Sequence, residues 1–173
     1  FEQHNGKLQV LIAAWGQGSQ RVTKAVKNKQ CPLRLPGGFT LHPAFNGIYL
    51  GTVLTIDASA SSSISKRLAA AGLAHHRLTV NVWRANYIDM KVKKKLWVSL
   101  VRTIALYCGV TWCPLAGDII KLERWQNKKL RHLYRSPAHI DKESNEQLRT
   151  RAGVPTMESS LRADRLRWVR SMF

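Results

Sequence analysis

The chain has 173 residues, 45% of them hydrophobic, which is enough for one folded domain or for two small subdomains sharing a core. Its 28 Lys and Arg residues outnumber 10 Asp and Glu residues, so the formal charge is +18 and opposes compaction unless a polyanion neutralises it. The basic residues are spread along the chain instead of clustering beside an apolar anchor, so nucleic acid is favoured over an acidic membrane surface as that polyanion.

Uncharged stretches and cysteines narrow the class of protein further. The longest uncharged stretch, residues 35–56, contains two prolines and four glycines, which excludes it as a membrane-spanning helix. Cys31, Cys108 and Cys113 are an odd number without a Cys-x-x-Cys pair, which argues against a disulfide framework. We therefore expect an intracellular, reducing compartment, with the nucleus or an organelle such as the mitochondrion as options.

The first part of the chain predicts short strands and one helix. Residues 10–15 form an apolar run that ends at a glycine, as a buried strand would. Residues 19–29 have the spacing of a basic amphipathic helix. Residues 31–41 predict a hairpin around a Gly-Gly pair, and residues 48–56 predict a strand broken at Gly51.

Beyond Asp57 the apolar spacing changes from two to nearly four, which predicts helices. The first covers residues 64–83 and is expected to bury Ile64, Leu68, Ala71 and Leu78. A second, over residues 90–107, is expected to bury Val92, Leu96, Leu100 and Ile104. A third, over residues 118–134, is expected to begin at Asp118 as a cap and to bury Ile119, Leu122, Trp125, Leu130 and Leu133.

Two shorter helices are predicted over residues 143–151 and 157–172. Thr156 is expected to cap the last helix, and Glu158 matches its dipole. Its buried side is expected to consist of Leu161, Leu166, Val169 and Phe173. The predicted fold class is α+β, with a mixed region over residues 1–57, a helical bundle over 58–140 and C-terminal basic helices over 141–173, packed on or after the bundle.

The basic residues on the helical faces are the candidate nucleic-acid contacts. Four lysines lie in the first turns of the helix over residues 90–107, where they oppose the helix dipole; a bound phosphate and a simple solvated face explain them equally well. The helix over residues 118–134 presents a basic stripe suited to a sugar-phosphate backbone. The candidate contacts are Lys24, Lys27, Lys66, Arg67, Lys91, Lys93, Lys94, Lys95, Arg124, Lys128, Lys129, Arg131, Arg135, Arg165 and Arg167.

Other residue types give weaker signals. Adjacent His75 and His76 point about 100° apart on a helix and lack a third ligand, so no metal site is predicted. Trp83, Trp97 and Trp125 lie on or beside apolar seams, which favours the core over base stacking. No cofactor or small-molecule substrate is expected.

Several short motifs resemble, in order, the tail of a reverse transcriptase of the non-long-terminal-repeat retrotransposon type. Residues 6–11, Gly-Lys-Leu-Gln-Val-Leu, resemble the family's Gly-Lys-Thr-Glu-x-Leu element at the end of the palm, with Leu and Gln in place of Thr and Glu. Tyr49, Leu50 and Gly51 resemble the Tyr-Leu-Gly of the primer-grip hairpin. Residues 64–68, 107–112, 144–149 and 161–168 resemble the thumb and post-thumb helices, including a Tyr-Cys-Gly-x-x-Trp segment and an Arg-Leu-Arg-Trp run.

The resemblance implies the C-terminal palm, primer grip and thumb of an RNA-directed DNA polymerase, which embrace a nucleic-acid duplex. Two-metal phosphoryl transfer needs clustered carboxylates that hold two cations roughly 3.5–4 Å apart. The acids within residues 1–118 are Glu2, Asp57, Asp89 and Asp118, none of them adjacent. We expect no catalytic residue here, and in the family the paired aspartates would lie upstream of Phe1.

Three functions remain open from the sequence. The first is a retrotransposon-derived remnant that binds RNA or an RNA–DNA duplex through its backbone and is catalytically silent alone. The second is a structural, RNA-bound subunit of a large ribonucleoprotein such as an organellar ribosome, with further protein partners. The third is a fragment of an active polymerase whose other part supplies the aspartates.

Overall fold

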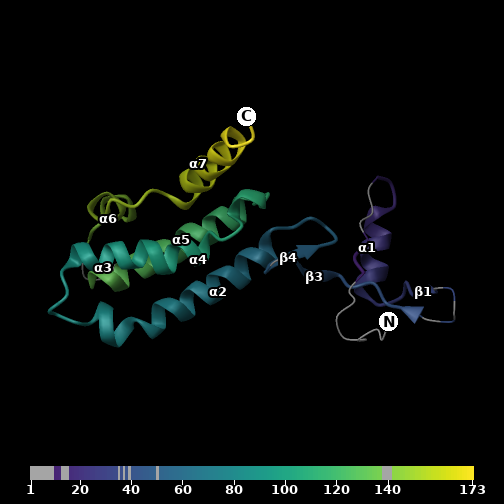
Figure 1. The fold of residues 1–173 in the computed structure, drawn as a ribbon, viewed down its shortest axis with the longest axis horizontal. Coiled ribbons are helices and arrows are strands. Elements are labelled where there is room, and N and C mark those ends of the chain that lie inside the picture. The colour runs from purple at the N-terminus through teal and green to yellow at the C-terminus, as the bar shows by residue number, and fades with distance from the viewer. Residues whose placement is uncertain are drawn as a thin grey trace. The chain divides into compact units, whose positions relative to one another are not determined.

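The computed structural model describes residues 10–12, 16–34, 36, 38, 40–49, 51–137 and 142–173. The fold class is α+β, as predicted: short strands precede a mainly helical region (Figure 1). The chain forms two compact units, Phe1–Ser63 and Ile64–Phe173, and each is described by itself below. The second unit contains both the predicted bundle and the predicted C-terminal helices.

The first unit contains one helix and two hairpins. Helix α1 (Ser19–Lys27) follows Gly18, whose φ of 91° turns the chain into the helix. Strands β1 (Leu33–Arg34) and β2 (Thr40–Leu41) pair antiparallel and confirm the first predicted hairpin. Residues 10–12 have no regular secondary structure, so the strand predicted there is wrong for them; residues 13–15 lie outside the described residues.

The segment predicted as one interrupted strand is instead a second hairpin. Strands β3 (Asn46–Tyr49) and β4 (Thr52–Thr55) pair antiparallel, with Tyr49 opposite Thr52. Gly51, at a φ of 80°, provides the left-handed backbone that such a tight turn requires. The hydroxyl of Ser63 bonds both the N–H and the carbonyl of Val53 at 3.0 and 3.1 Å, and so fixes β4 to the end of this unit.

Helix α2 (Ser61–Arg77) leads into a π-helical turn, η1 (Thr79–Trp83). Ile64, Leu68 and Ala71 are buried as predicted, whereas Leu78 is only partly covered. Trp83 closes the turn from inside the unit, because its indole N–H donates to the carbonyl of His75 at 2.8 Å.

The next helical segment runs through α3 (Met90–Leu96), a π-helical η2 (Trp97–Arg102) and α4 (Thr103–Ala105). Its buried residues are Lys93, Trp97, Val101 and Ala105, one position later than the predicted Val92, Leu96, Leu100 and Ile104. Both sets repeat every four residues, so spacing alone did not distinguish them. The structure selects the set that contains the large indole of Trp97, which gains most from burial.

The central helix α5 (Ala116–Tyr134) follows a short 3-10 turn, η3 (Gly109–Thr111). In η3, a Cβ on Gly109 would meet Leu161 at 2.6 Å, so only glycine permits this approach. Helix α5 begins two residues before the predicted start, because Asp118 is its third residue and accepts from the N–H of Leu115 at 3.2 Å. The predicted seam is confirmed at Leu122, Leu130 and Leu133, while Ile119 and Trp125 are only partly buried.

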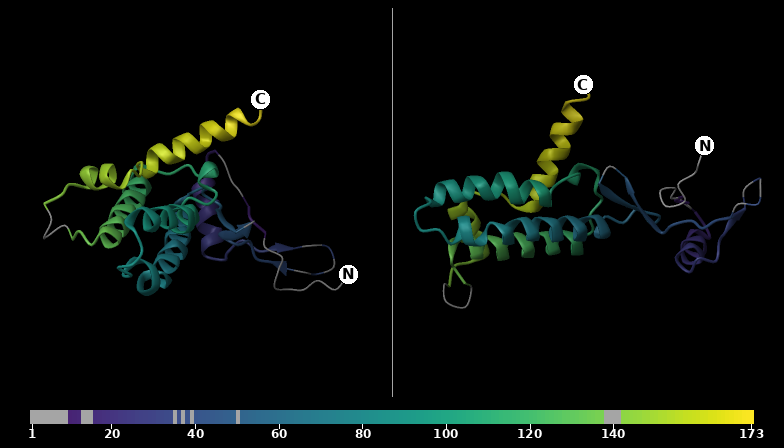
Figure 2. Two further views of the ribbon diagram at one scale, coloured as in Figure 1. Left: turned by 60° about the vertical axis from the view of Figure 1, so that its left-hand side comes forward. Right: turned by 60° about the horizontal axis from the view of Figure 1, so that its bottom comes forward.

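Helices α6 (Asn145–Ala152) and α7 (Met157–Arg170) both contact α5. The Thr156 hydroxyl caps α7 as predicted, accepting from the Ser159 N–H at 3.1 Å. The predicted buried side of α7 is confirmed at Leu161 but wrong at Leu166, Val169 and Phe173, which are exposed. Figure 2 shows the reason: the end of α7 projects away from the other helices of its unit.

Candidate nucleic-acid interface

The second unit has a large positive charge that its own acids do not offset at the surface. It holds 22 Lys and Arg residues against 8 Asp and Glu residues, a formal charge of +14. Five of these acids have partners inside the chain. Asp118 caps α5, Glu123 binds the start of α7, and Glu143, Glu158 and Asp164 form ion pairs with arginines.

Glu123 shows how an acid serves the fold. Its Oε1 accepts from the backbone N–H groups of Met157 and Glu158 at 2.6 and 3.3 Å. These are orphan donors at the N-terminus of α7, where the helix dipole also favours a negative charge. The carboxylate is therefore directed away from the outer surface of α5, and it leaves the basic residues there without an acidic neighbour on the same stripe.

A basic stripe follows the outer side of α5. Lys121, Arg124 and Lys128 succeed one another at intervals of three and four, which places them on one face of α5. Arg135, the C-cap residue, follows seven positions later, and all four are exposed. Between Lys121 and Arg135 the helix rises about 20 Å, roughly the length of six base-pair steps at 3.4 Å each. We call these four residues the α5 stripe. Its geometry suits contacts with successive phosphates.

A second basic surface lies at the start of α3. Lys91, Lys94 and Lys95 line a groove of about 490 Å³ together with Val98, Ser99 and Gly153. The ammonium of Lys94 lies close to Gly153, the C-cap of α6, where the helix dipole favours a cation. Lys91 and Lys95 are exposed at the rim of the groove and are available to an anion.

Four of the candidate contacts are used at least partly inside the fold. Lys93 is buried, and its ammonium donates to the carbonyls of Trp83 and Ala85 at 3.2 and 2.5 Å. Arg165 donates to the carbonyl of Trp112. Arg131 and Arg135 also donate to backbone carbonyls, yet Arg135 remains exposed. Lys93 therefore does not belong to the surface on which the sequence placed it.

The other predicted contacts occupy varied surroundings. Arg167 pairs with Asp164 at 3.0 Å, which weakens its attraction for a phosphate. The Arg67 guanidinium lies 4.0 Å from the centre of the Tyr107 ring, a cation–π geometry. Lys66 is exposed on α2, and Lys129 is partly covered, so that burial lowers its pKa.

In the first unit, Lys24 and Lys27 line a pocket of about 570 Å³ that also contains Asp57. The Lys27 ammonium lies 5.4 Å from the centre of the Phe45 ring. A hydrogen bond involving Thr55 holds the pKa of Asp57 below its usual value, so this carboxylate stays ionised beside the lysines. The pocket thus offers an anion less attraction than its lysines alone suggest.

The primer-grip resemblance falls on the β3–β4 hairpin. Tyr49 is exposed, which excludes the ordinary buried strand that the Tyr-Leu-Gly sequence also fits. Gly51 makes the turn, and Leu50 lies outside the described residues. A solvent-facing tyrosine on a hairpin is able to support a polynucleotide chain, although the geometry by itself assigns no ligand.

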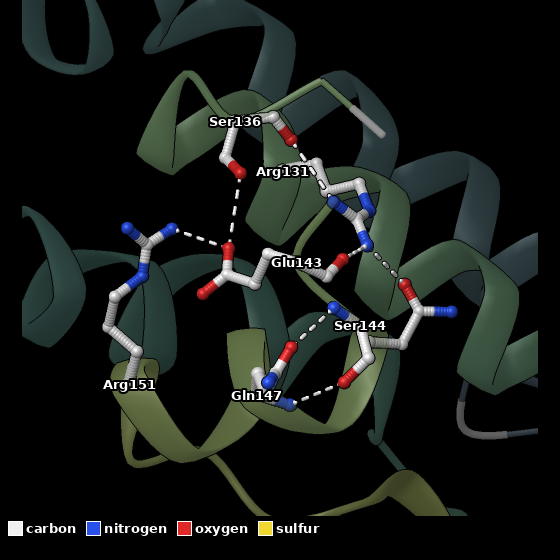
Figure 3. Close-up of polar contacts among 7 residues, drawn as sticks. Arg131, Ser136, Glu143, Ser144, Gln147 and Arg151 are labelled. Carbon is white, nitrogen blue, oxygen red and sulfur yellow. Dashed lines mark hydrogen bonds and ion pairs between the residues drawn. The ribbon is translucent and has the colours of Figure 1, made fainter. Parts of the chain in front are cut away.

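The end of α5 is fastened to α6 by a polar network (Figure 3). Arg131 donates to the carbonyls of Ser136 and Glu143 at 3.3 and 2.8 Å and to the side-chain oxygen of Asn145 at 2.9 Å. The Glu143 carboxylate accepts from Ser136 and pairs with Arg151 at 2.9 Å. Ser144 and Gln147 complete a capping box on α6. These contacts fix the position of the last turn of α5.

A second network holds α7 to η2 and α5. The Arg102 guanidinium donates to Gln126 at 3.2 Å and also reaches Ser160 and the carbonyl of Pro155. Gln126 is fully buried and donates to the same carbonyl at 3.0 Å. Burial lowers the pKa of Arg102, and Asp164 and Glu123 oppose that effect. Arg102 is therefore a structural cation that holds α7 to η2 and α5.

Sequence reasoning missed a histidine pair that joins α2 to α5. Nε2 of buried His75 and Nδ1 of His132 lie 2.9 Å apart, and the His75 ring stacks on Trp83 with ring centres 5.4 Å apart. Burial, together with the nearby Lys129 and His132, lowers the pKa of His75 to about 3. The two histidines are 57 positions apart, so no local sequence signal pairs them.

Within the described residues, no three His, Cys, Asp or Glu side chains come close enough to hold a metal ion. No helix among them is long and apolar enough to cross a membrane. Comparison with protein-family models, with curated proteins and with solved structures finds no match.

Proposed function

We propose that the chain is a nucleic-acid-binding module that grips the sugar-phosphate backbone of RNA or of an RNA–DNA duplex and performs no chemistry alone. The single observation that carries this proposal is the α5 stripe, which is exposed while five acids of its unit bind helix ends or arginines. Neutralising such a surface releases counterions from the polyanion and makes binding favourable without any base-specific contact.

The likeness to a reverse-transcriptase thumb deepens the proposal without being needed for it. A thumb grips the product duplex with helices, and the second unit is a set of helices with a cationic outer face. On this view the β3–β4 hairpin corresponds to a primer grip, with Tyr49 presented to solvent. The module would be a retrotransposon-derived remnant.

The test is binding of the purified chain to an RNA–DNA hybrid, duplex DNA and single-stranded RNA, by fluorescence anisotropy across a salt series. We expect a log–log salt slope of several units and the tightest binding for the A-form hybrid. The double variant Arg124→Gln, Lys128→Gln should reduce that slope by about 2 units, because each lost phosphate contact removes about one.

The matched control is Arg162→Gln, Arg167→Gln, which removes the same charge. Both arginines are paired with acids of α7, at 2.6 and 3.0 Å, so the slope should change by less than about 1 unit. Equal losses in the two double variants would reduce the stripe to one part of a diffuse net charge. Folded protein that fails to bind near physiological salt would overturn the proposal.

One observation favours a second function, a structural subunit of a ribonucleoprotein. Large apolar side chains are exposed at the end of α7 and just after it: Leu166, Trp168, Val169, Met172 and Phe173. An apolar surface of this kind is typical of a protein contact. Such a subunit would use both surfaces at once, with RNA on one and protein on the other. Steep salt dependence combined with self-association that Trp168→Ser abolishes would favour it over the free-standing module.

A further inference from the structure

A pocket of about 530 Å³ opens at the C-terminal end of α5, where the α5 stripe ends. Its lining residues come from η1, α5 and the residues beside them: Trp83, Arg84, Arg131, His132, Arg135 and Pro137. Among the residues that the structure describes, neither a carboxylate nor a lysine contributes to this lining. Three guanidinium groups and the rings of Trp83, His132 and Pro137 line one hollow, which is within the size range of ordinary ligand pockets.

The flat side of the pocket is rigidly held. Trp83 stacks on His75 with an angle of 25° between the rings and donates its indole N–H to the His75 carbonyl. His132 is held by the 2.9 Å contact with His75. Burial lowers the pKa of His132, and Lys129 and Arg84 lower it further, so the imidazole is neutral near pH 7. A neutral, preoriented aromatic surface suits stacking better than a charged, mobile one.

The charged side is held as firmly. The Nη2 atom of Arg135 donates to the carbonyl of Arg84 at 2.7 Å and to Asn86 at 3.3 Å. These bonds do not use the Nε and Nη1 donors of the same guanidinium group. Arg131 is fixed by the network of Figure 3. The Arg84 side chain is exposed, and none of the ion pairs among described residues involves it.

We propose that this pocket binds a single nucleotide unit, with an unstacked base against the exposed His132 ring and Pro137, over the buried Trp83, and with its phosphate on the guanidinium groups of Arg84 and Arg135. The inference rests on the proposed function, since the stripe would bring a polynucleotide to the pocket. Aromatic rings and guanidinium planes are the groups on which proteins stack splayed bases, and arginine forks hold phosphates.

The position of the pocket supports this class of ligand over a free inorganic anion. His132 lies one helical turn beyond Lys128, and Arg135 belongs to both the stripe and the lining. A strand following the stripe thus reaches the pocket past basic lining residues, Arg131 and Arg135. An inorganic anion would use the arginines but would make no use of the exposed His132 ring.

The experiment uses the full chain and adenosine 5′-monophosphate as the probe, followed by calorimetry and by chemical shifts of the tryptophan indole N–H groups. Ribose 5-phosphate, adenosine and inorganic phosphate serve as separate arms. We expect the mononucleotide to bind at least about fivefold tighter than each of the three and to shift one indole resonance, which Trp83→Phe identifies. Equal binding of ribose 5-phosphate or phosphate would overturn the base site.

Arg84→Gln should weaken mononucleotide binding by about fivefold or more. It should lower the salt slope for hybrid binding by no more than about 1 unit. Arg77→Gln is the matched control, because it removes the same charge from an exposed arginine outside the lining. Equal weakening in both variants would overturn the site. If the unmodified chain binds the hybrid but not the mononucleotide, the pocket proposal alone is overturned. If the unmodified chain fails to bind the hybrid, the proposed function is overturned.

Discussion

On the inner face of α5, Leu122, Gln126 and Leu130 are completely buried against the other helices of the unit. On its outer face, Lys121, Arg124 and Lys128 are exposed. One helix therefore supplies the core on one side and the candidate interface on the other. The difference teaches that folding and binding should respond to separate sets of substitutions, because a residue on one face has little contact with the partners of the other.

The largest expected effect breaks the inner face. Leu130→Ala should lower the free energy of unfolding of the second unit by about 3 kcal/mol, because a fully buried leucine leaves a cavity that the neighbours fill only in part. Urea denaturation followed by circular dichroism measures the change. Lys128→Ala, two positions away on the outer face, should stay within about 0.5 kcal/mol. Similar losses in both variants would contradict the separation of the faces.

Acidification should act on the seam between α2 and α5. The folded-state pKa of His75 is about 3, below the ordinary value of 6.5, so the unfolded chain binds a proton first. The contribution is complete above pH 6.5 and is lost as the pH falls toward 3, with about 2 kcal/mol gone by pH 5. Denaturation at several pH values checks this.

The lowered pKa of His132 acts in the same direction, and Lys129 contributes to the lowered pKa of both histidines. His75→Phe should reduce the pH dependence between 6.5 and 5 by about one proton. His76→Asn, at an exposed neighbouring position, is the control and should leave it nearly unchanged. A wild-type stability that stays flat over this range would show that the imidazole is hydrated.

A smaller effect should distinguish two glutamates, Glu123 within α5 and Glu146 at the start of α6. Glu123→Gln should destabilise the second unit by about 1 kcal/mol, because it removes the charge that the N-terminus of α7 attracts. Glu146→Gln, at an exposed position in the first turn of α6, should cost no more than about 0.5 kcal/mol. If the two costs are equal, Glu123 has no special capping role.

The smallest effect has the opposite sign and extends the comparison to α3. Lys91→Gln removes a cation from the first turn of that helix, where it opposes the dipole, so the free energy of unfolding should rise by about 0.3–0.5 kcal/mol. The same variant should bind a polyanion more weakly. Joint measurement of thermal unfolding and salt-dependent binding checks the pair. A stability loss would show that Lys91 has a structural partner.

Much of the fold was predictable from local signals. The turn residues located the first hairpin, and the Thr156 cap and the seam at Leu122, Leu130 and Leu133 followed from spacing and helix-end chemistry. These features depend on neighbours within a few positions in the sequence. Arg124, Lys128 and Arg135 of the α5 stripe were predicted contacts on the same ground. Lys121 was not among the predicted contacts, and the predicted Lys129 and Arg131 are partly covered.

The remainder required information from distant positions. The burial of Lys93 depends on carbonyls of Trp83 and Ala85, which precede it by a chain reversal. The exposure of Leu166 depends on whether a neighbouring helix reaches it, which no periodicity reports. The pocket depends on the approach of η1 to the end of α5. In each case the missing information was tertiary.

The wide turn in η2 has a consequence for insertions and deletions. A π-helical turn closes its hydrogen bonds over five residues instead of four, so it accommodates one more residue than an α-helix of the same length. Removing one residue from Trp97–Arg102 would restore ordinary α-helical bonding locally. Because the deleted residue is the extra one that the wide turn accommodates, the residues after it would keep their faces, with Ala105 in the core and Gly109 close to Leu161. The same deletion in an α-helix would rotate the downstream residues by about 100°. This segment should therefore tolerate the loss of one residue that α5 would not.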